Sequence, residues 1–217
     1  MKSHVMAGLI FGLAISLSAG ARANLLINPG AETGDLTGWT KGGTSNPLVD
    51  NGTFNSGITP HSGSFDFLGG TGTSGTLTQN VSLAALPGIA NSLIDSGMAL
   101  ADVSFWEQGL NQGTTSDNAF VTLQFRDAGN AIIGSVSTPV IDSHNLTWQE
   151  FAGSFAIPNG TRSIDYTMNF TRHVGSDLDS YFDDNSLLVS SAVPEPATFL
   201  MLGVGIIGVA VYMRRRK

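Results

Sequence analysis

The sequence contains no cysteine among its 217 residues, and only 12% of its residues are charged. The absence of thiols excludes a disulfide scaffold, a cysteine zinc site, an iron–sulfur cluster and a cysteine nucleophile. Charged residues are about half as frequent as the usual ~25%, whereas glycine is abundant, with 27 residues. This composition is typical of a single turn-rich β domain and argues against a helical bundle.

Basic side chains are scarce in the middle of the chain, which has four: Lys41, Arg126, Arg162 and Arg172. The same region has 16 acidic side chains, between residues 32 and 184, so its net charge is −12. Such a field repels phosphate backbones, so we expect no nucleic-acid partner. Divalent cations and neutral polar polymers are better partners for it.

The N-terminal residues have the three parts of a secretory signal peptide. Lys2 precedes an apolar run over residues 5–17, and Ala21 and Ala23 form an Ala-x-Ala site. The pattern predicts a signal peptide over residues 1–23, with cleavage after Ala23 and export of the protein. The alternative is a buried N-terminal helix.

The C-terminal residues begin with the motif Pro194-Glu195-Pro196, preceded by Val193. Residues 197–213 carry no charge, and residues 214–217 are all basic. Seventeen residues form ~25 Å of helix, the short end of a transmembrane span. The pattern predicts a domain outside the inner membrane and a cytoplasmic basic tail; the alternative is an ordinary tail anchor.

This end of the chain, residues 191–217, resembles the PEP-CTERM sorting signal of exopolysaccharide-producing Gram-negative bacteria. The resemblance implies that exosortase, a membrane-embedded protease, recognises Pro194, Glu195 and Pro196 and removes the helix. The protein would then be a membrane-anchored precursor that is released to the cell surface or to the extracellular matrix.

The middle of the chain shows the alternation of half-buried strands. Val103 and Phe105 share one face of a strand, and residues 119–125 alternate in the same way. Further strands are predicted at residues 24–28, 64–68, 76–83, 132–137, 147–155, 163–170 and 181–189, with turn residues between them. The one helical candidate, residues 83–93, is interrupted by Pro87 and Gly88. The pattern predicts an all-β antiparallel sandwich over residues 24–190.

Several motifs in this region are similar to those of galactose-binding-like jelly rolls, a superfamily that includes many carbohydrate-binding modules. They are residues 24–39, 60–65, 147–149, 157–161 and 181–184. The resemblance implies a jelly-roll β-sandwich. Two positions depart from the family pattern, because Ala31 replaces an aromatic residue and Asn185 replaces a β-branched one.

The resemblance also implies a structural Ca²⁺ site between the first and last strands. Glu32 and Asp183 would supply side-chain oxygens, and residues 62–64 would supply backbone carbonyls. Carboxylates that approach one another repel unless a cation lies between them, and oxygen ligands suit Ca²⁺. The alternative has no metal: Glu32 caps a turn and Asp183 accepts hydrogen bonds from neighbouring N–H groups.

Three tryptophans are candidates for either packing or ligand binding. Trp39 and Trp148 are predicted to lie in the core. Trp106 lies opposite Val103 and Phe105 on its strand, so it is a possible glycan-stacking surface. Its expected polar neighbours are Gln124, Arg126 and Asn169. The alternative is that Trp106 packs beneath a loop.

The sequence gives little support for catalysis, because it has no nucleophile elbow, no His-Glu-x-x-His helix and no phosphate loop. The leading hypothesis is an exported, non-catalytic protein of the surface or matrix that associates with exopolysaccharide. The alternative is a sugar-specific carbohydrate-binding module, followed by a polysaccharide hydrolase.

Overall fold

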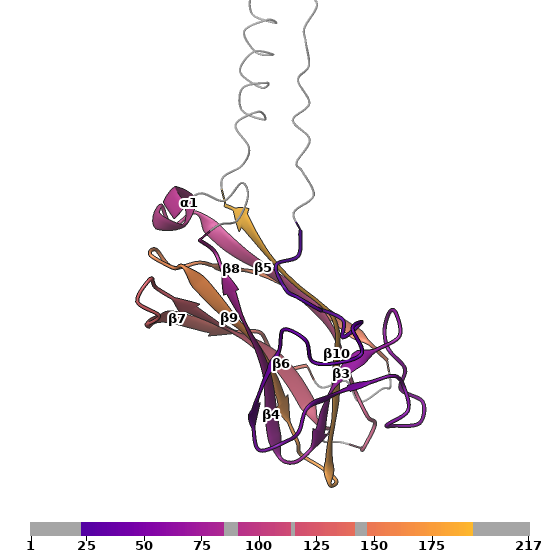
Figure 1. Ribbon diagram of the computed structural model, residues 1–217. Helices are drawn as coiled ribbons and strands as arrows, with labels where there is room; N and C mark the ends of the chain where they lie inside the picture. Colours follow the sequence, from indigo (N-terminus) through magenta and orange to yellow (C-terminus); the bar gives the residue numbers. More distant parts are fainter. Residues whose placement is uncertain (1–22, 85–90, 114–115, 142–146, 193–217) are drawn as a thin grey trace, which may run out of the picture.

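The computed structural model describes residues 23–84, 91–113, 116–141 and 147–192 as two packed β-sheets (Figure 1). The predicted signal peptide, apart from the exposed Ala23, lies outside the described residues, as do the sorting motif and the predicted span at 197–213. Within the described part of the chain, no helix is long and apolar enough to cross a membrane.

Each sheet has five antiparallel strands. Sheet A has the order β1-β4-β9-β6-β7, and sheet B has the order β2-β3-β10-β5-β8. The strands of sheet A are β1 (Thr40–Gly43), β4 (Ser74–Ser82), β9 (Ser163–Thr171), β6 (Asn118–Arg126) and β7 (Ile132–Ser137). Those of sheet B are β2 (Leu48–Asp50), β3 (Asp66–Thr71), β10 (Asp177–Ser191), β5 (Ala99–Gly109) and β8 (Gln149–Ala156). The predicted all-β antiparallel sandwich is confirmed.

Alternate side chains of the strands form the core between the sheets, as the period of two requires. In β6 and β9 the buried positions are held by large apolar side chains: Val121, Leu123, Phe125, Ile164, Tyr166, Met168 and Phe170. Phe170 of sheet A meets Phe182 of sheet B edge to face, with ring centroids 5.3 Å apart. Trp39 packs against Phe67 and Tyr166, so its predicted place in the core is confirmed.

The last strand, β10, occupies the middle of sheet B. It pairs with β3 from Asp177 to Phe182 and with β5 from Ser180 to Ser191. Beyond Phe182, the side of β10 that faces away from β5 meets the N-terminal segment, where the Leu25 N–H donates to the Leu187 carbonyl at 3.0 Å. The first and last parts of the described chain are therefore neighbours.

Most predicted strands are confirmed within a few residues, but one predicted strand is absent and two short strands were missed. Residues 24–28 form no strand, because Asn24 bonds to β10 partly through its side chain and Asn28 has φ of 50°. Strands β1 and β2 were not predicted, since they are short and lack clear alternation. The described part of the doubtful helical segment contributes only to α1 (Asn91–Asp95).

Candidate functional site

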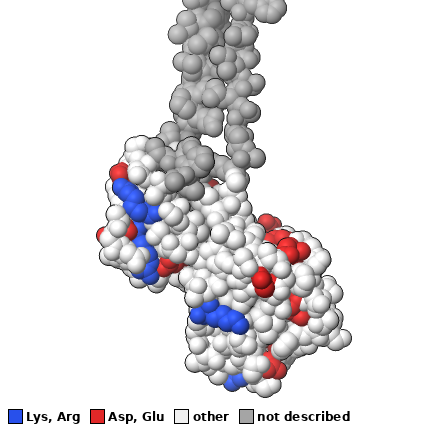
Figure 2. Space-filling model, viewed as in Figure 1, with Lys and Arg blue, Asp and Glu red and all other residues white. Residues whose placement is uncertain are grey.

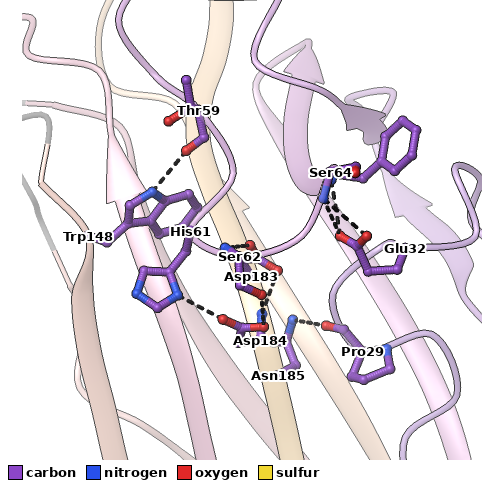
Figure 3. A network of polar contacts seen from close by, with 11 residues as sticks. Pro29, Glu32, Thr59, His61, Ser62, Ser64, Trp148, Asp183, Asp184 and Asn185 are labelled. Atoms are coloured by element: carbon purple, nitrogen blue, oxygen red, sulfur yellow. Dashed lines mark hydrogen bonds and ion pairs between the residues drawn. The ribbon is translucent and has the colours of Figure 1, made fainter.

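Residues 51–65 form a loop over the outer side of sheet B. Ile58 from this loop is fully buried with Leu68 and Tyr181 in a small apolar cluster separate from the main core. Trp148, just before β8, donates a hydrogen bond from Nε1 to the Thr59 carbonyl at 3.0 Å. Figure 3 shows how this anchoring places the end of the loop over β10.

The end of the loop contacts a bulge in β10, where the pairing register shifts between Asp183 and Ser186. Asp184 in this bulge has φ of 47°, a conformation that non-glycine residues rarely adopt. Its carboxylate lies 2.7 Å from His61 Nδ1 and accepts a hydrogen bond of 2.6 Å from Ser62 Oγ (Figure 3). The loop thus compensates for the backbone strain at the bulge.

The two predicted metal ligands, Glu32 and Asp183, reach the same loop. Asp183 accepts the Ser62 N–H at 3.0 Å, and Glu32 accepts the Ser64 N–H at 3.0 Å. Ca²⁺ takes six to eight oxygen ligands, whereas these carboxylates are engaged by N–H donors. Among the described residues, no group of three or more His, Asp or Glu side chains is arranged to hold a metal. The geometry resembles the metal-free alternative, and the Ca²⁺ site stays a prediction.

Buried carboxyl groups line this part of sheet B. Asp66 stands opposite Asp50 in the strand register and is fully buried, and its carboxyl oxygens have no hydrogen-bond partner among the described residues. Burial, reinforced by the negative charges of Asp50 and Asp183, raises the pKa of Asp66 to about 8. Burial also raises the pKa of Asp183 to about 7. Both groups therefore bind protons near neutral pH.

Trp106 lies on the outer side of sheet B, beneath the loop. Its ring stacks on His61 with centroids 3.9 Å apart and an interplanar angle of 16°, so one ring face is covered. The polar side chains expected beside it lie on strands β6 and β9 of the other sheet: Gln124, Arg126 and Asn169. The prediction of that grouping is wrong, because local alternation gives the face of a strand but not its sheet.

The outer face of sheet A carries a row of hydroxyl side chains in strand register. Its members are Thr40, Thr78, Thr167, Thr122 and Ser137, one from each of the five strands. Thr78 and Thr167 are hydrogen bonded through Oγ1 at 3.0 Å, and Thr122 contacts Ser137 at 2.9 Å. With strands ~4.8 Å apart, the row is ~19 Å long.

A second polar row lies beside the first, formed by Asn80, Asp165, Gln124 and Ser135. Arg126 pairs with Asp165 at 2.6 Å, so the charges on this face compensate each other. The Gln124 amide has no hydrogen-bond partner among the described residues and is half-buried. Phe120, also half-buried, adds an aromatic ring. Most of the surface visible in Figure 2 carries neither acidic nor basic side chains.

Sequence reasoning missed the roles of His61 and Asn185. His61 stood among turn residues with no periodic signal. Asn185 was noted only as a departure from the family pattern, yet it is 1% exposed and donates from its side chain to the Pro29 carbonyl at 2.8 Å. It also accepts the Tyr166 hydroxyl at 3.0 Å, and the Asn24 side chain donates to its carbonyl. Asn185 therefore ties the N-terminal segment to β10 and the core.

Residues 192–217 match the PEP-CTERM protein-sorting motif. No curated protein matches the chain in sequence.

The solved structures with a similar fold include an enzymatically active domain of tailspike protein 4 from bacteriophage CBA120. It has a TM-score of 0.56 and 15% identity, over 77% of this chain and 21% of the tailspike domain. TmCBM61, solved in complex with β-1,4-galactotriose, has a TM-score of 0.53 and 22% identity, over 77% of this chain and 99% of that one. The CBM22-1–CBM22-2 tandem domain of Paenibacillus barcinonensis Xyn10C has a TM-score of 0.52 and 15% identity. That match covers 82% of this chain and 48% of the tandem domain.

This chain therefore spans about a fifth of the tailspike domain and about half of the tandem domain, but nearly all of TmCBM61. At these identities the likeness concerns the fold. The protein is a β-sandwich with the jelly-roll fold of carbohydrate-binding modules, followed by a PEP-CTERM protein-sorting motif at residues 192–217.

Proposed function

We propose that the protein is an exported, non-catalytic β-sandwich that exosortase sorts to the cell surface or the extracellular matrix. There it binds a neutral exopolysaccharide across the outer face of sheet A. The observation that carries this proposal is the hydroxyl row that crosses all five strands of that sheet.

A hydroxyl group both donates and accepts hydrogen bonds, so an evenly spaced row of them can exchange bonds with the hydroxyls of a sugar polymer. The Gln124 amide, which has no hydrogen-bond partner in the described part of the chain, adds donors and an acceptor, and the Phe120 ring offers an apolar surface for a sugar face. The negative charge of the domain disfavours anionic polymers. A neutral polysaccharide fits these features best.

A binding role also agrees better than hydrolysis with the carboxylates of this face. Glycosidases use two carboxyl groups ~5 to 9.5 Å apart. Among the described strands of sheet A, Asp165 is the only acidic residue, and it is held by Arg126. The fold shared with TmCBM61, a module solved with a bound galactotriose, also supports a binding role.

Affinity electrophoresis of the exported protein in gels containing the native exopolysaccharide tests the proposal. The double substitution Thr78→Val and Thr167→Val removes two hydroxyls of the row while keeping side-chain shape. At ~0.5 to 1.5 kcal/mol for each lost hydrogen bond, we expect binding to weaken about tenfold. The control Thr59→Val, at an exposed position outside sheet A, should leave retardation unchanged.

A second pair of variants distinguishes polysaccharide binding by the outer face of sheet A from a nonspecific effect of changing any surface residue. Gln124→Ala should weaken retardation several-fold, whereas Gln149→Ala, an exposed glutamine on β8 of the other sheet, should not. Equal retardation of all variants, or no retardation of the parent protein, would contradict polysaccharide binding by this face.

A further inference from the structure

Strand β10 remains hydrogen bonded up to the start of the sorting motif. Ser191 pairs with Ala99, and the Ala192 N–H donates to the Met98 carbonyl at 2.7 Å. Pro194, the first proline of the motif, follows only two residues after Ala192. At ~3.3 Å per extended residue, the motif begins within ~7 Å of the folded sandwich.

A protease binds several extended residues on each side of the bond that it cleaves, and it engages their backbone N–H and C=O groups. The residues directly before the motif already use these groups to pair with β5. The enzyme and β5 therefore compete for the same backbone. We propose that residues 190–192 separate from β5 before exosortase processes the motif, and that Val189 marks the point where separation stops.

The contacts of these residues show why separation is confined to them. β5 is the only described strand that pairs with Ser190 and Ser191, because the pairing of β10 with β3 ends at Phe182. Both serines are half-buried and Ala192 is exposed, so their release removes no large apolar side chain from the core. Short strand ends with few apolar contacts lie at the low end of local opening free energies.

Val189 differs from the residues that follow it. Its side chain is 1% exposed and belongs to the main core, so its release would open the space between the sheets. Two residues earlier, Leu187 is also buried in the core, and its backbone is bonded to the N-terminal segment. Separation of residues 190–192 adds ~10 Å of free chain before the motif, enough to bring it away from the sandwich.

This inference rests on the proposed sorting by exosortase, and a reversible lock on the strand end tests it in the full-length chain in cells. The pair Leu100→Cys and Ser190→Cys joins residues that stand opposite each other in the register. The spacing of such pairs permits a disulfide, and the chain has no other cysteine. The matched control is Ser104→Cys with Ser186→Cys, also register partners, but nearer the middle of the same strand pair.

We expect the oxidised strand-end lock to accumulate as unprocessed precursor at least tenfold over the control, measured by immunoblot and intact mass. A reductant should restore processing. Inserting six Gly and Ser residues between Ala192 and Val193 should restore processing in the locked variant without reductant, and should accelerate it in the unlocked chain. The insertion also distinguishes a lock from misfolding, because it leaves the disulfide in place.

Processing of the locked variant at the rate of the control would overturn the inference, as would an insertion that leaves the unlocked rate unchanged. A parent protein that is never cleaved would instead overturn the sorting part of the proposed function. Polysaccharide binding does not enter either measurement, so the two failures are distinguishable.

Discussion

The buried Asp66 carboxyl should make the stability of the domain depend on pH. Its pKa is raised from an ordinary value of 3.8 to about 8 by burial and by the negative charges of Asp50 and Asp183. Between pH 5 and pH 7 the folded protein therefore holds a proton on Asp66 that the unfolded chain has lost. Because the folded state binds more protons, its stability falls as pH rises through this window.

The size of this change in stability follows from the one proton that the folded protein binds and the unfolded chain does not. The free energy of unfolding falls by ~1.36 kcal/mol for each pH unit, or ~2.7 kcal/mol from pH 5 to pH 7. Asp66→Asn removes this titration while keeping a neutral side chain of the same shape. Any cost of burying the amide is the same at both pH values, so it cancels from the comparison, as does the titration of Asp183.

Thermal unfolding of the exported protein and the variant at constant ionic strength measures the effect. For a domain of this size, 1 kcal/mol corresponds to a Tm change of ~2 to 4 °C. We therefore expect the difference between the Tm of Asp66→Asn and the Tm of the parent to be ~5 to 10 °C more positive at pH 7 than at pH 5. Asp95→Asn is the control. The hydrogen bond from Arg162 lowers the pKa of Asp95, so this group stays ionised throughout the window. A Tm difference for Asp66→Asn that is the same at both pH values would refute the reasoning.

Three other measurements address the metal, the sorting motif and the N-terminal contact. If Glu32 and Asp183 hold Ca²⁺, EDTA should lower the Tm, because a ligand at a hundredfold excess over Kd stabilises by ~2.7 kcal/mol; Asp183→Asn should remove this sensitivity, and identical melting with and without chelator would contradict the site. Glu195→Ala should leave a membrane-bound precursor of higher mass, whereas a parent protein that retains residues 214–217 would identify a permanent anchor. Asn185→Ala should lower the free energy of unfolding by ~2 to 4 kcal/mol in denaturant titrations, because it leaves buried polar partners unpaired; a loss no larger than that of the exposed Asn80→Ala would argue against this contact.

The sequence alone determined the strands with a clear alternation and the C-terminal signal. In β5 from Ala99 to Phe105 and in β6 from Ala119 to Phe125 every second side chain is apolar, and this period of two follows from backbone geometry without reference to other parts of the chain. The sorting motif is likewise a linear pattern, and residues 192–217 match it as predicted. Information of this kind is local, so it can be read from neighbouring residues.

Other features of the sequence were too weak or too short to read. Strands β1 and β2 have four and three residues, and their place is set by pairing with β4 and β3. Residues 24–28 carry an apolar pattern, yet side-chain hydrogen bonds to β10 replace the expected strand. Local propensity is a weak guide where tertiary contacts supply the hydrogen bonds.

Tertiary structure decided which faces became candidate sites. Alternation placed Trp106 on an outer face, but only the strand order shows that Gln124 lies on the opposite sheet. The same order aligns Thr78, Thr167 and Thr122 in one hydroxyl row, although they are far apart in sequence. Strand register is a long-range property, because it depends on which surfaces are buried together and not on any one segment.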